Sequence, residues 1–223
     1  EKDTDLRQVV SVKAEKLWPS EEKWKILSDK HPEMVYIPAG PSLLGPLNQE
    51  FSFGLARPGQ PVATEVEVDA FYIDRFEFPN VKEDKDGNPI PPITGQNHDQ
   101  ATELCEKLGK RLCSSYEWEK SCKGPGNKIY SYGDSYDPDL CKDSDDYLLG
   151  ANETCSSGYG VFGLSGGPRE WTSTPSPGSS SRRLIKGGEM VNVERGFRCS
   201  FQTDDLMGYA DDQTSFRCCL DAE

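Results

Sequence analysis

Cysteine and histidine are the side chains of this chain whose types and spacing bear most directly on chemistry. The 223 residues include eight cysteines, none spaced C-x-x-C, and only two histidines, His31 and His98. Zinc is usually held by closely spaced Cys and His ligands, so this set does not suit it. Disulfide bonds suit the cysteines better and imply an oxidising compartment, so we expect a periplasmic, outer-membrane-associated or secreted protein. The alternative is a set of reduced, buried thiols in a cytosolic protein.

Charge and hydropathy exclude two classes of function. The formal net charge is 25 − 38 = −13, whereas nucleic-acid binders need a basic face, so we expect no nucleic-acid partner. The acidity serves either solubility or an acidic docking surface. No apolar run approaches the roughly 20 residues of a membrane helix. The first residue is Glu1, so the chain looks mature or trimmed, and a lipid anchor upstream is compatible with it.

The elements that must position these cysteines begin with a distinct N-terminal segment. Residues 1–30 are charged, carry an imperfect apolar helical stripe over residues 6–14, and have Ser20 where a second helix can be capped. We interpret them as a helical extension that packs on the core or contacts a partner. Residues 31–223 are then the main domain.

Short strands and long irregular segments fill the main domain. Residues 34–40 read as an apolar strand, and residues 62–73 as a second pair of strands. Residues 80–98 are rich in turn-forming residues and predict a surface loop. Residues 130–183 show little periodicity, which indicates an irregular fold that disulfides hold together.

Two helices are expected between these irregular segments. The first runs from Gln100 to Leu108, with an apolar face of Ala101, Leu104, Cys105 and Leu108. The second starts at the capping box that opens with Ser114 and runs through Cys122. Both cysteines lie on inward helix faces, where they can reach a central sheet.

Five sequence blocks occur in an order and spacing that resemble the formylglycine-generating enzyme, or sulfatase-modifying factor, family. They are the stretch from Gly109-Lys110-Arg111-Leu112 through Glu117-Trp118-Glu119, then Gly163-Leu164-Ser165-Gly166, Arg169-Glu170-Trp171-Thr172, Lys186-Gly187-Gly188 and Ser215-Phe216-Arg217-Cys218. The resemblance implies an α+β fold of the C-type-lectin-like kind, irregular, with little regular secondary structure and stapled by disulfides.

The resemblance also implies disulfide partners, which spacing alone leaves open among 105 connectivities. The family's vertebrate-type bridges, carried over by residue, give Cys105–Cys218 and Cys122–Cys199. The remaining four cysteines would then form a local Cys141–Cys155 bridge and a Cys113–Cys219 bridge.

The family's metal site is degenerate in this chain. Its enzymes oxidise a substrate cysteine to formylglycine with copper held by two cysteines after a G-G-S segment. Here Glu189 stands for the Ser, Asn192 for the first metal cysteine, and the second has no counterpart. Cu(I) selects soft thiolates, so no copper is expected. The resemblance places Arg169, Glu170 and Trp171 beside Glu189 and Asn192 at a ligand groove, although Trp171 suits the core better than a ligand platform.

Iron and calcium are the other metals that the resemblance brings up. A second branch of the family holds iron with histidines of an added domain, but His31 and His98 cannot build a three-histidine site and are expected to be ordinary surface residues. Family members also bind structural calcium, for which Asp143, Asp145 and Asn152 offer hard oxygen ligands. The alternative for this segment is a solvated acidic loop.

Two functions are therefore compatible with the sequence. The first is a non-catalytic binding or scaffold protein of an envelope or extracellular assembly, with a protein or glycan partner. The second is an oxidoreductase or other enzyme of the same fold, in which Glu189 or Glu194 performs acid–base work in place of the missing cysteines. A perturbed carboxylate in a pocket would favour the enzyme, and an exposed apolar or aromatic patch would favour the scaffold.

Overall fold

The fold combines short helices and strands with long irregular connections, as predicted. A computed structural model describes residues 2–52, 60–141, 148–150, 153–188 and 193–222. In this part, the helices are α1 (Lys2–Glu15), α2 (Glu21–Lys30), α3 (Asn48–Ser52), α4 (His98–Glu106), α5 (Ser115–Lys123) and α6 (Val193–Phe197). The strands are β1 (Met34–Ile37), β2 (Gly40–Leu44), β3 (Thr64–Val68), β4 (Phe71–Asp74), β5 (Arg111–Leu112), β6 (Arg169–Pro175), β7 (Arg182–Lys186), β8 (Gln202–Leu206), β9 (Thr214–Phe216) and β10 (Cys218–Asp221).

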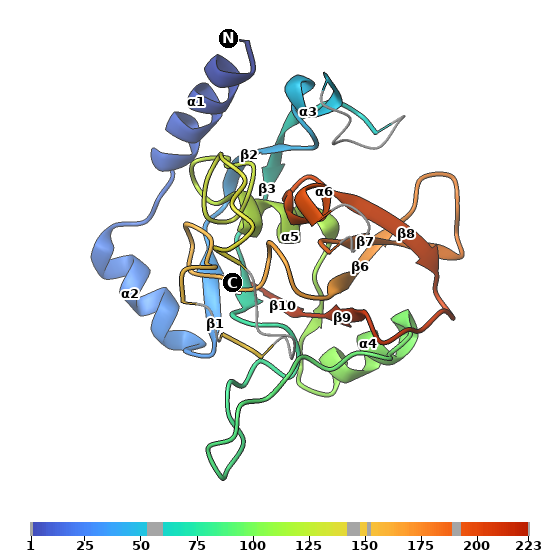
Figure 1. Cartoon of the computed structure of the whole chain (residues 1–223). Coiled ribbons are helices and arrows are strands. Elements are labelled where there is room, and N and C mark those ends of the chain that lie inside the picture. Colours follow the sequence, from blue (N-terminus) through green and yellow to red (C-terminus); the bar gives the residue numbers. More distant parts are fainter. Residues whose placement is uncertain (1, 53–59, 142–147, 151–152, 189–192, 223) are drawn as a thin grey trace.

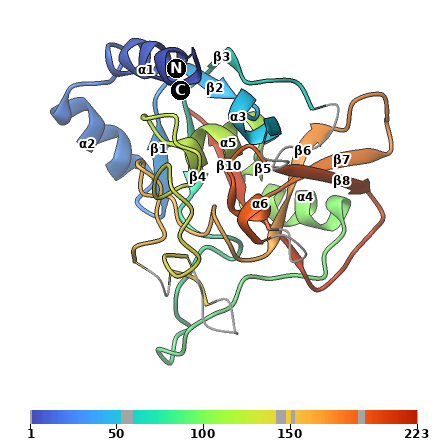
Figure 2. The same cartoon turned by 45° about the horizontal axis from the view of Figure 1, so that its top comes forward.

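Three small sheets surround helix α5 (Figures 1 and 2). One sheet has the order β1-β4-β10-β5, the second pairs β2 with β3, and the third has the order β8-β7-β6-β9. Most pairings are antiparallel, but β6 and β9 run parallel. Helix α5 contacts β2, β6 and β7, so it joins two of the sheets. None of the described helices is long and apolar enough to cross a membrane.

The strands expected over residues 62–73 do not pair with each other. Strand β3 pairs with β2, whereas β4 lies between β1 and β10. The burial pattern gives the reason. Every residue of β4 is buried, as a central strand requires, whereas β3 is largely exposed and suits a two-stranded ribbon at the surface.

The two expected helices of residues 1–30 are present and pack on the first strands. Helix α1 lies on β2, with Val10 and Ala14 buried at 0% and 6% exposure. Helix α2 begins after Ser20, whose Oγ accepts a hydrogen bond from the Lys23 amide at 3.3 Å. Leu27 of α2 packs with residues of β1 and β4. The division of the chain at residue 30 stays a prediction, because the helices share the core of the strands that follow.

Capping boxes determine where the other two long helices, α4 and α5, begin. Helix α5 starts at the predicted capping box, in which Ser114 and Glu117 satisfy each other's backbone amides. Helix α4 starts earlier than predicted, because Asn97 forms a capping box with Gln100. It also ends earlier, so Leu108 lies beyond the helix and is 55% exposed, and its predicted place on the buried face is wrong.

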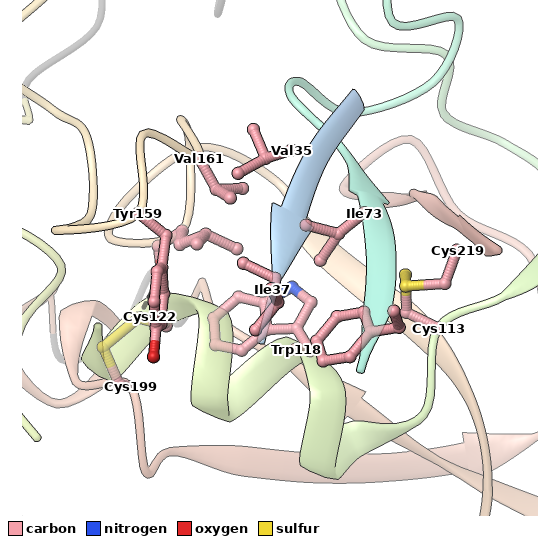
Figure 3. Close-up of a cluster of buried hydrophobic side chains, with 12 residues drawn as sticks. Val35, Ile37, Ile73, Cys113, Trp118, Cys122, Tyr159, Val161, Cys199 and Cys219 are labelled. Atoms are coloured by element: carbon pink, nitrogen blue, oxygen red, sulfur yellow. Dashed lines mark hydrogen bonds between the residues drawn. A yellow bond between two sulfur atoms is a disulfide. The ribbon is translucent and has the colours of Figure 1, made fainter. Parts of the chain in front are cut away.

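A cluster around Trp118 forms the centre of the hydrophobic core. The indole points from α5 toward Ile37 of β1 and Ile73 of β4, as Figure 3 shows, and is 1% exposed. Val161, from the irregular region before β6, is fully buried in the same cluster. Apolar burial of this kind is the main stabilising contribution that an irregular chain can make.

Four disulfides tie the irregular segments to this core, in the predicted pairings. They are Cys105–Cys218, Cys113–Cys219, Cys122–Cys199 and Cys141–Cys155, and their partners are 113, 106, 77 and 14 residues apart in sequence. Cys218 and Cys219 are neighbours in β10, so their side chains leave opposite faces of the strand. One bonds to α4 and the other to the segment between β5 and α5.

Candidate functional site

Arg169, at the start of β6, is the one predicted groove residue in the described part whose side chain is partly open to solvent. Its side chain is 23% exposed. Its Nε donates to Thr214 Oγ1 at 2.9 Å, and its Nη2 donates to the Asp211 carboxylate. Burial tends to raise the pKa of Asp211, but the hydrogen bonds from Thr214 and Arg169 outweigh burial and leave that pKa lowered. The Arg169 guanidinium is therefore held in place by these contacts and remains partly accessible to solvent.

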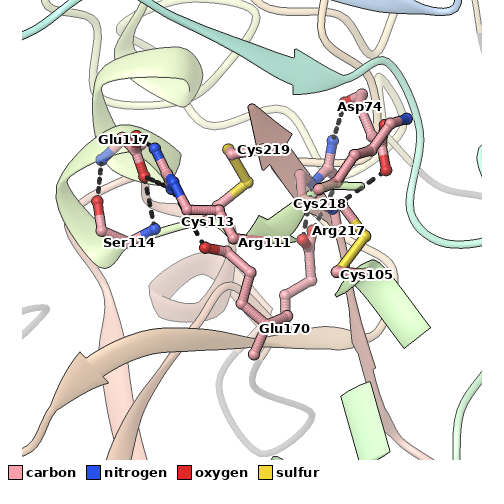
Figure 4. The surroundings of a disulfide bond; sticks show 12 residues. Asp74, Cys105, Arg111, Cys113, Ser114, Glu117, Glu170, Arg217, Cys218 and Cys219 are labelled. Carbon is pink, nitrogen blue, oxygen red and sulfur yellow. Dashed lines mark hydrogen bonds and ion pairs between the residues drawn. A yellow bond between two sulfur atoms is a disulfide. The ribbon is translucent and has the colours of Figure 1, made fainter. Parts of the chain in front are cut away.

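Glu170 and Trp171, the next two groove candidates, are enclosed by the protein. Glu170 is 0% exposed and accepts two hydrogen bonds of 2.7 Å from Arg217 of the β9–β10 connection (Figure 4). Trp171 is 1% exposed, and its Nε1 donates to the Gln96 carbonyl at 3.0 Å. Neither side chain can reach a ligand in this conformation. The expectation that Trp171 suits the core is confirmed.

Glu189 and Asn192, the degenerate metal positions, lie outside the described residues, but the chain on both sides of them is well defined. At the end of β7, Gly188 has φ +39°. A Cβ on Gly188 would lie 2.9 Å from the Arg169 amide nitrogen and 2.9 Å from the Gly167 carbonyl oxygen. Only glycine allows the two backbones to come so close. The Gly-Gly step therefore brings the backbone at Gly188 close to that of Arg169.

A buried charge triad holds the strand that leads into the 189–192 segment. Lys186 of β7 and Lys123 of α5 each lie 2.9 Å from a carboxylate oxygen of Glu119, and all three side chains are at most 5% exposed. Burial opposes ionisation of Glu119, but the two ammonium groups outweigh it and lower its pKa to about 2. Lys186 also lies over the Trp118 ring, 5.4 Å from its centroid. This triad was not predicted from the sequence, although Glu119 and Lys186 belong to two of the five blocks.

Helix α6 places a second polar cluster immediately after the segment. Glu194 Oε1 accepts hydrogen bonds from Tyr130 Oη at 3.1 Å and from Arg198 Nη2 at 3.0 Å. Arg198 also pairs with the buried Glu50 at 3.2 Å. Burial raises the pKa of Tyr130 well above its usual value, so the phenol stays protonated and can donate. The Glu194 side chain is 38% exposed, so this carboxylate is open to solvent.

The cysteines cannot supply the soft ligands that copper needs. All eight cysteines of the chain form the four disulfides, and their side chains are buried. Cys113 and Cys219, the pair that could have lent a thiol to the groove, are bonded to each other. Cu(I) sites are built from thiolate or thioether sulfur, and Met190, the one sulfur in the 189–192 segment, cannot replace a pair of thiolates. The residues present therefore do not fit the family's copper site.

The histidines lie apart from this region, and one corrects the prediction. His31 is partly exposed and lies edge-on to Tyr72, with ring centroids 4.6 Å apart. His98 is not an ordinary surface residue, because it is only 7% exposed and packs edge-on against Trp171. Burial lowers the pKa of His98. Across the described residues, no three His, Cys, Asp or Glu side chains come together as a metal site.

The calcium candidates Asp143, Asp145 and Asn152 lie outside the described residues. Asp134, in the segment where the family's first calcium site would lie, is engaged by protein cations. Arg7 of α1 and Lys128 both pair with its carboxylate. Burial tends to raise the pKa of Asp134, but these cations outweigh it and lower that pKa.

Comparisons with known proteins agree with this geometry. The family described as "Sulfatase-modifying factor enzyme 1-like domain" matches residues 79–222. The formylglycine-generating enzyme of Bos taurus is 23% identical over 167 residues, which cover 60% of this chain and 45% of that enzyme. The chain spans less than half the length of the curated relatives that it matches.

Two solved structures have the same fold. PvdO from Pseudomonas aeruginosa superposes with a TM-score of 0.64 at 16% identity, covering 85% of this chain and 94% of PvdO. CarF gives a TM-score of 0.61 at 12% identity, covering 86% of this chain and 98% of CarF. At these identities the likeness shows a shared fold and nothing of the chemistry.

Proposed function

The chain belongs to the family of sulfatase-modifying factor enzyme 1-like domains, and we propose that it is a non-catalytic binding or scaffold member. Its place is an oxidising compartment, periplasmic, outer-membrane-associated or secreted, since four disulfides persist only there. Its partner is a protein or a glycan of an envelope or extracellular assembly.

The state of the cysteines is the observation that carries this proposal. Family chemistry on a substrate cysteine depends on two thiolates at one metal ion, and every thiol of this chain is used in a disulfide. The described residues that lead up to this position are nevertheless tightly held, because Gly188 packs closely on Arg169 and Lys186 pairs with Glu119. A family fold that is kept without the family's metal ligands supports recognition rather than oxidation.

The polar residues at this groove support binding of a polar partner. Glu189 and Asn192 replace the Ser and the first metal cysteine, and Arg169, which packs on Gly188, offers a partly exposed guanidinium. A carboxylate, an amide and a guanidinium together supply donors and acceptors for peptide backbone or sugar hydroxyls.

Site-specific photo-crosslinking in the native host tests the proposal. A photoreactive amino acid at Glu189 should give a discrete crosslinked species. The same group at Val81, a half-exposed residue far from Glu189 in sequence, should not. In parallel, the purified protein supplied with copper and oxygen should produce no aldehyde on a cysteine-containing sulfatase peptide. Aldehyde above a metal-free control, or identical crosslinks at positions 189 and 81, would overturn the proposal.

Glu194 supports a second candidate, an enzyme with a carboxylate site. Its side chain is open to solvent, lies just after the 189–192 segment, and hydrogen bonds to a protonated tyrosine and an arginine. Such a carboxylate could exchange a proton with a bound substrate. If it does, Glu194→Gln should abolish turnover of the substrate and leave its binding intact.

A further inference from the structure

Helix α1 has two apolar faces, and only one of them is used by the core. Val10 and Ala14 are buried against β2 and its neighbours. Leu6, Val9 and Val12 are 39%, 51% and 44% exposed on the other side of the helix. We call these three residues the α1 stripe. Helix α1 lies at the periphery of the molecule in Figures 1 and 2, so the stripe is accessible to another molecule.

Exposed apolar side chains concentrate in this part of the chain. Six of the thirteen exposed large hydrophobic residues of the described structure fall within residues 1–30. The same segment is electrically neutral, with seven basic and seven acidic residues, so residues 31–223 carry 18 − 31 = −13, the whole net charge. Clustered exposed apolar surface indicates an interaction site, and here it coincides with the uncharged region of a strongly acidic protein.

We propose that the α1 stripe is a self-association surface, on which a second copy of the chain packs its own α1 antiparallel about a two-fold axis at Val9. Asp5 and Lys13 are four residues before and after Val9, on the same helix face, and both are exposed. An antiparallel two-fold pairing places Asp5 of each copy against Lys13 of the other, and Leu6 against Val12. The stripe is thus complementary to itself in charge, and its apolar residues face one another.

The charge distribution favours a second copy over other occupants. A basic partner would be attracted to the acidic body of residues 31–223 rather than to the neutral helices. An anionic membrane surface selects helices with an excess of Lys and Arg, which residues 1–30 lack. When two copies meet at α1, the acidic residues 31–223 of each copy lie away from the contact. Salt screens the remaining repulsion between them beyond about 10 Å.

The contact is small, so the dimer is weak. Helix α1 has 14 residues and is about 21 Å long, which places the interface at the low end of the size range for specific complexes. Lys13 also forms an ion pair within its own chain, where its Nζ lies 2.7 Å from Glu65. Its attraction to Asp5 of the other copy is therefore weaker. We expect a dissociation constant on the order of 100 μM.

Sedimentation equilibrium over a range of concentrations around that value tests the proposal. The wild-type chain should show a monomer–dimer equilibrium, and Val9→Glu should raise the dissociation constant about tenfold or more, because it places two like charges on the symmetry axis. The matched control is Val81→Glu, since Val81 is also 51% exposed and lies outside residues 1–30. This control should leave the equilibrium unchanged.

Disulfide trapping tests the geometry separately. Because every native cysteine is paired, Val9→Cys introduces a lone thiol, and oxidation should link two copies through residue 9. Val81→Cys should link far less. A wild-type chain that stays monomeric throughout, a dimer unaffected by Val9→Glu, or equal trapping at residues 9 and 81 would overturn the proposal.

Discussion

Arg217 and Glu170 form a two-point ion pair in the interior, with Arg217 Nε on Oε2 and Nη2 on Oε1, both at 2.7 Å. Each side chain is 1% exposed. Because β6 and β9 run parallel, with Glu170 opposite Ser215, the pair joins β6 to the connection that leads into β10. Glu77 lies 3.6 Å from the same guanidinium. Two of the five sequence blocks therefore meet here for a structural reason, and not to bind a ligand.

The first prediction concerns a substitution that removes this ion pair. Glu170→Gln removes the two-point partner of the buried Arg217 charge and leaves Glu77, at 3.6 Å, and Asp74 as weaker partners. Breaking a buried ion pair by removing one partner is strongly destabilising. We expect a loss of about 3 kcal/mol in the free energy of unfolding, measured by urea denaturation. Glu103→Gln is the matched control, since Glu103 pairs with Lys107 on the surface and exposed pairs contribute little. Equal effects of the two changes would contradict the assigned role.

Local signals explain which parts of the fold could be predicted. The capping box at Ser114 and the inward positions of Cys105 and Cys122 depend on residues a few positions apart, and the structure has all of them. The disulfide pairs were predicted from the bridges of the family that the chain resembles, carried over by residue, and the structure has all four. The burial of Leu108 was predicted wrongly, because the apolar periodicity of the sequence continues past the residue at which helix α4 ends.

Tertiary packing explains what could not be predicted. His98 is buried because Trp171, 73 positions later, lies against it, and nothing near His98 in the sequence signals this. Likewise, Lys186 and Lys123 would be placed at the surface by residue type. Their burial depends on the Glu119 carboxylate between them and, for Lys123, on the carbonyls of Leu43 and Gly45.

The second prediction compares two disulfides by the length of chain that they close. Replacing Cys113 and Cys219 by alanine opens a loop of 106 residues, whereas replacing Cys141 and Cys155 opens one of 14. The chain-entropy relation gives roughly 4.7 kcal/mol for about 100 residues and roughly 3 for about 15. The first double variant should therefore be less stable than the second by about 1.7 kcal/mol, as measured by chemical denaturation.

A check on the pairings accompanies that comparison. Non-reducing digestion and mass spectrometry of the wild-type chain should recover the four bridges and no alkylated cysteine. Four or more free thiols would contradict both the pairing and the oxidising compartment.

The third prediction concerns acid. Burial lowers the pKa of His98 below its usual 6.5, and nearby Arg183 acts in the same direction, while Asp99 at 3.4 Å opposes them. The unfolded chain therefore takes up this proton more readily than the folded one. The contribution of His98 to stability is complete above about pH 6.5 and is lost as the pH falls toward the folded-state pKa.

Urea midpoints at pH 7.5 and 5.5 measure this effect, and His98→Gln should flatten the change between them. His31→Gln is the control for loss of a histidine and should keep the wild-type change. A pH response that His98→Gln leaves untouched would assign the acid sensitivity to other groups.

The fourth prediction concerns calcium, which we propose is bound by Asp143, Asp145 and Asn152. A ligand that prefers the folded state stabilises it by about 2.7 kcal/mol at a hundredfold excess over its dissociation constant. Millimolar calcium should raise the melting temperature and a chelator should lower it. Asp145→Asn should remove the response, whereas Asp86→Asn, which replaces an exposed carboxylate elsewhere in the chain, should not. No shift in either direction would leave the segment as a solvated acidic loop.

The last prediction concerns copper. Asn192→Cys restores a cysteine at the position of the first metal ligand, but a Cu(I) site of the family's kind needs two soft ligands held close together. The second ligand is missing, because the chain between Gly188 and Cys199 has no cysteine and Cys199 itself is bonded to Cys122. The variant should therefore bind Cu(I) no more tightly than the same substitution at Val81, in a competition titration against a chromogenic chelator. It should also form no aldehyde on a cysteine peptide. Tight binding specific to Asn192→Cys would mean that a disulfide opens to lend its sulfur to the groove, and the fold would then still be able to support the family's oxidation.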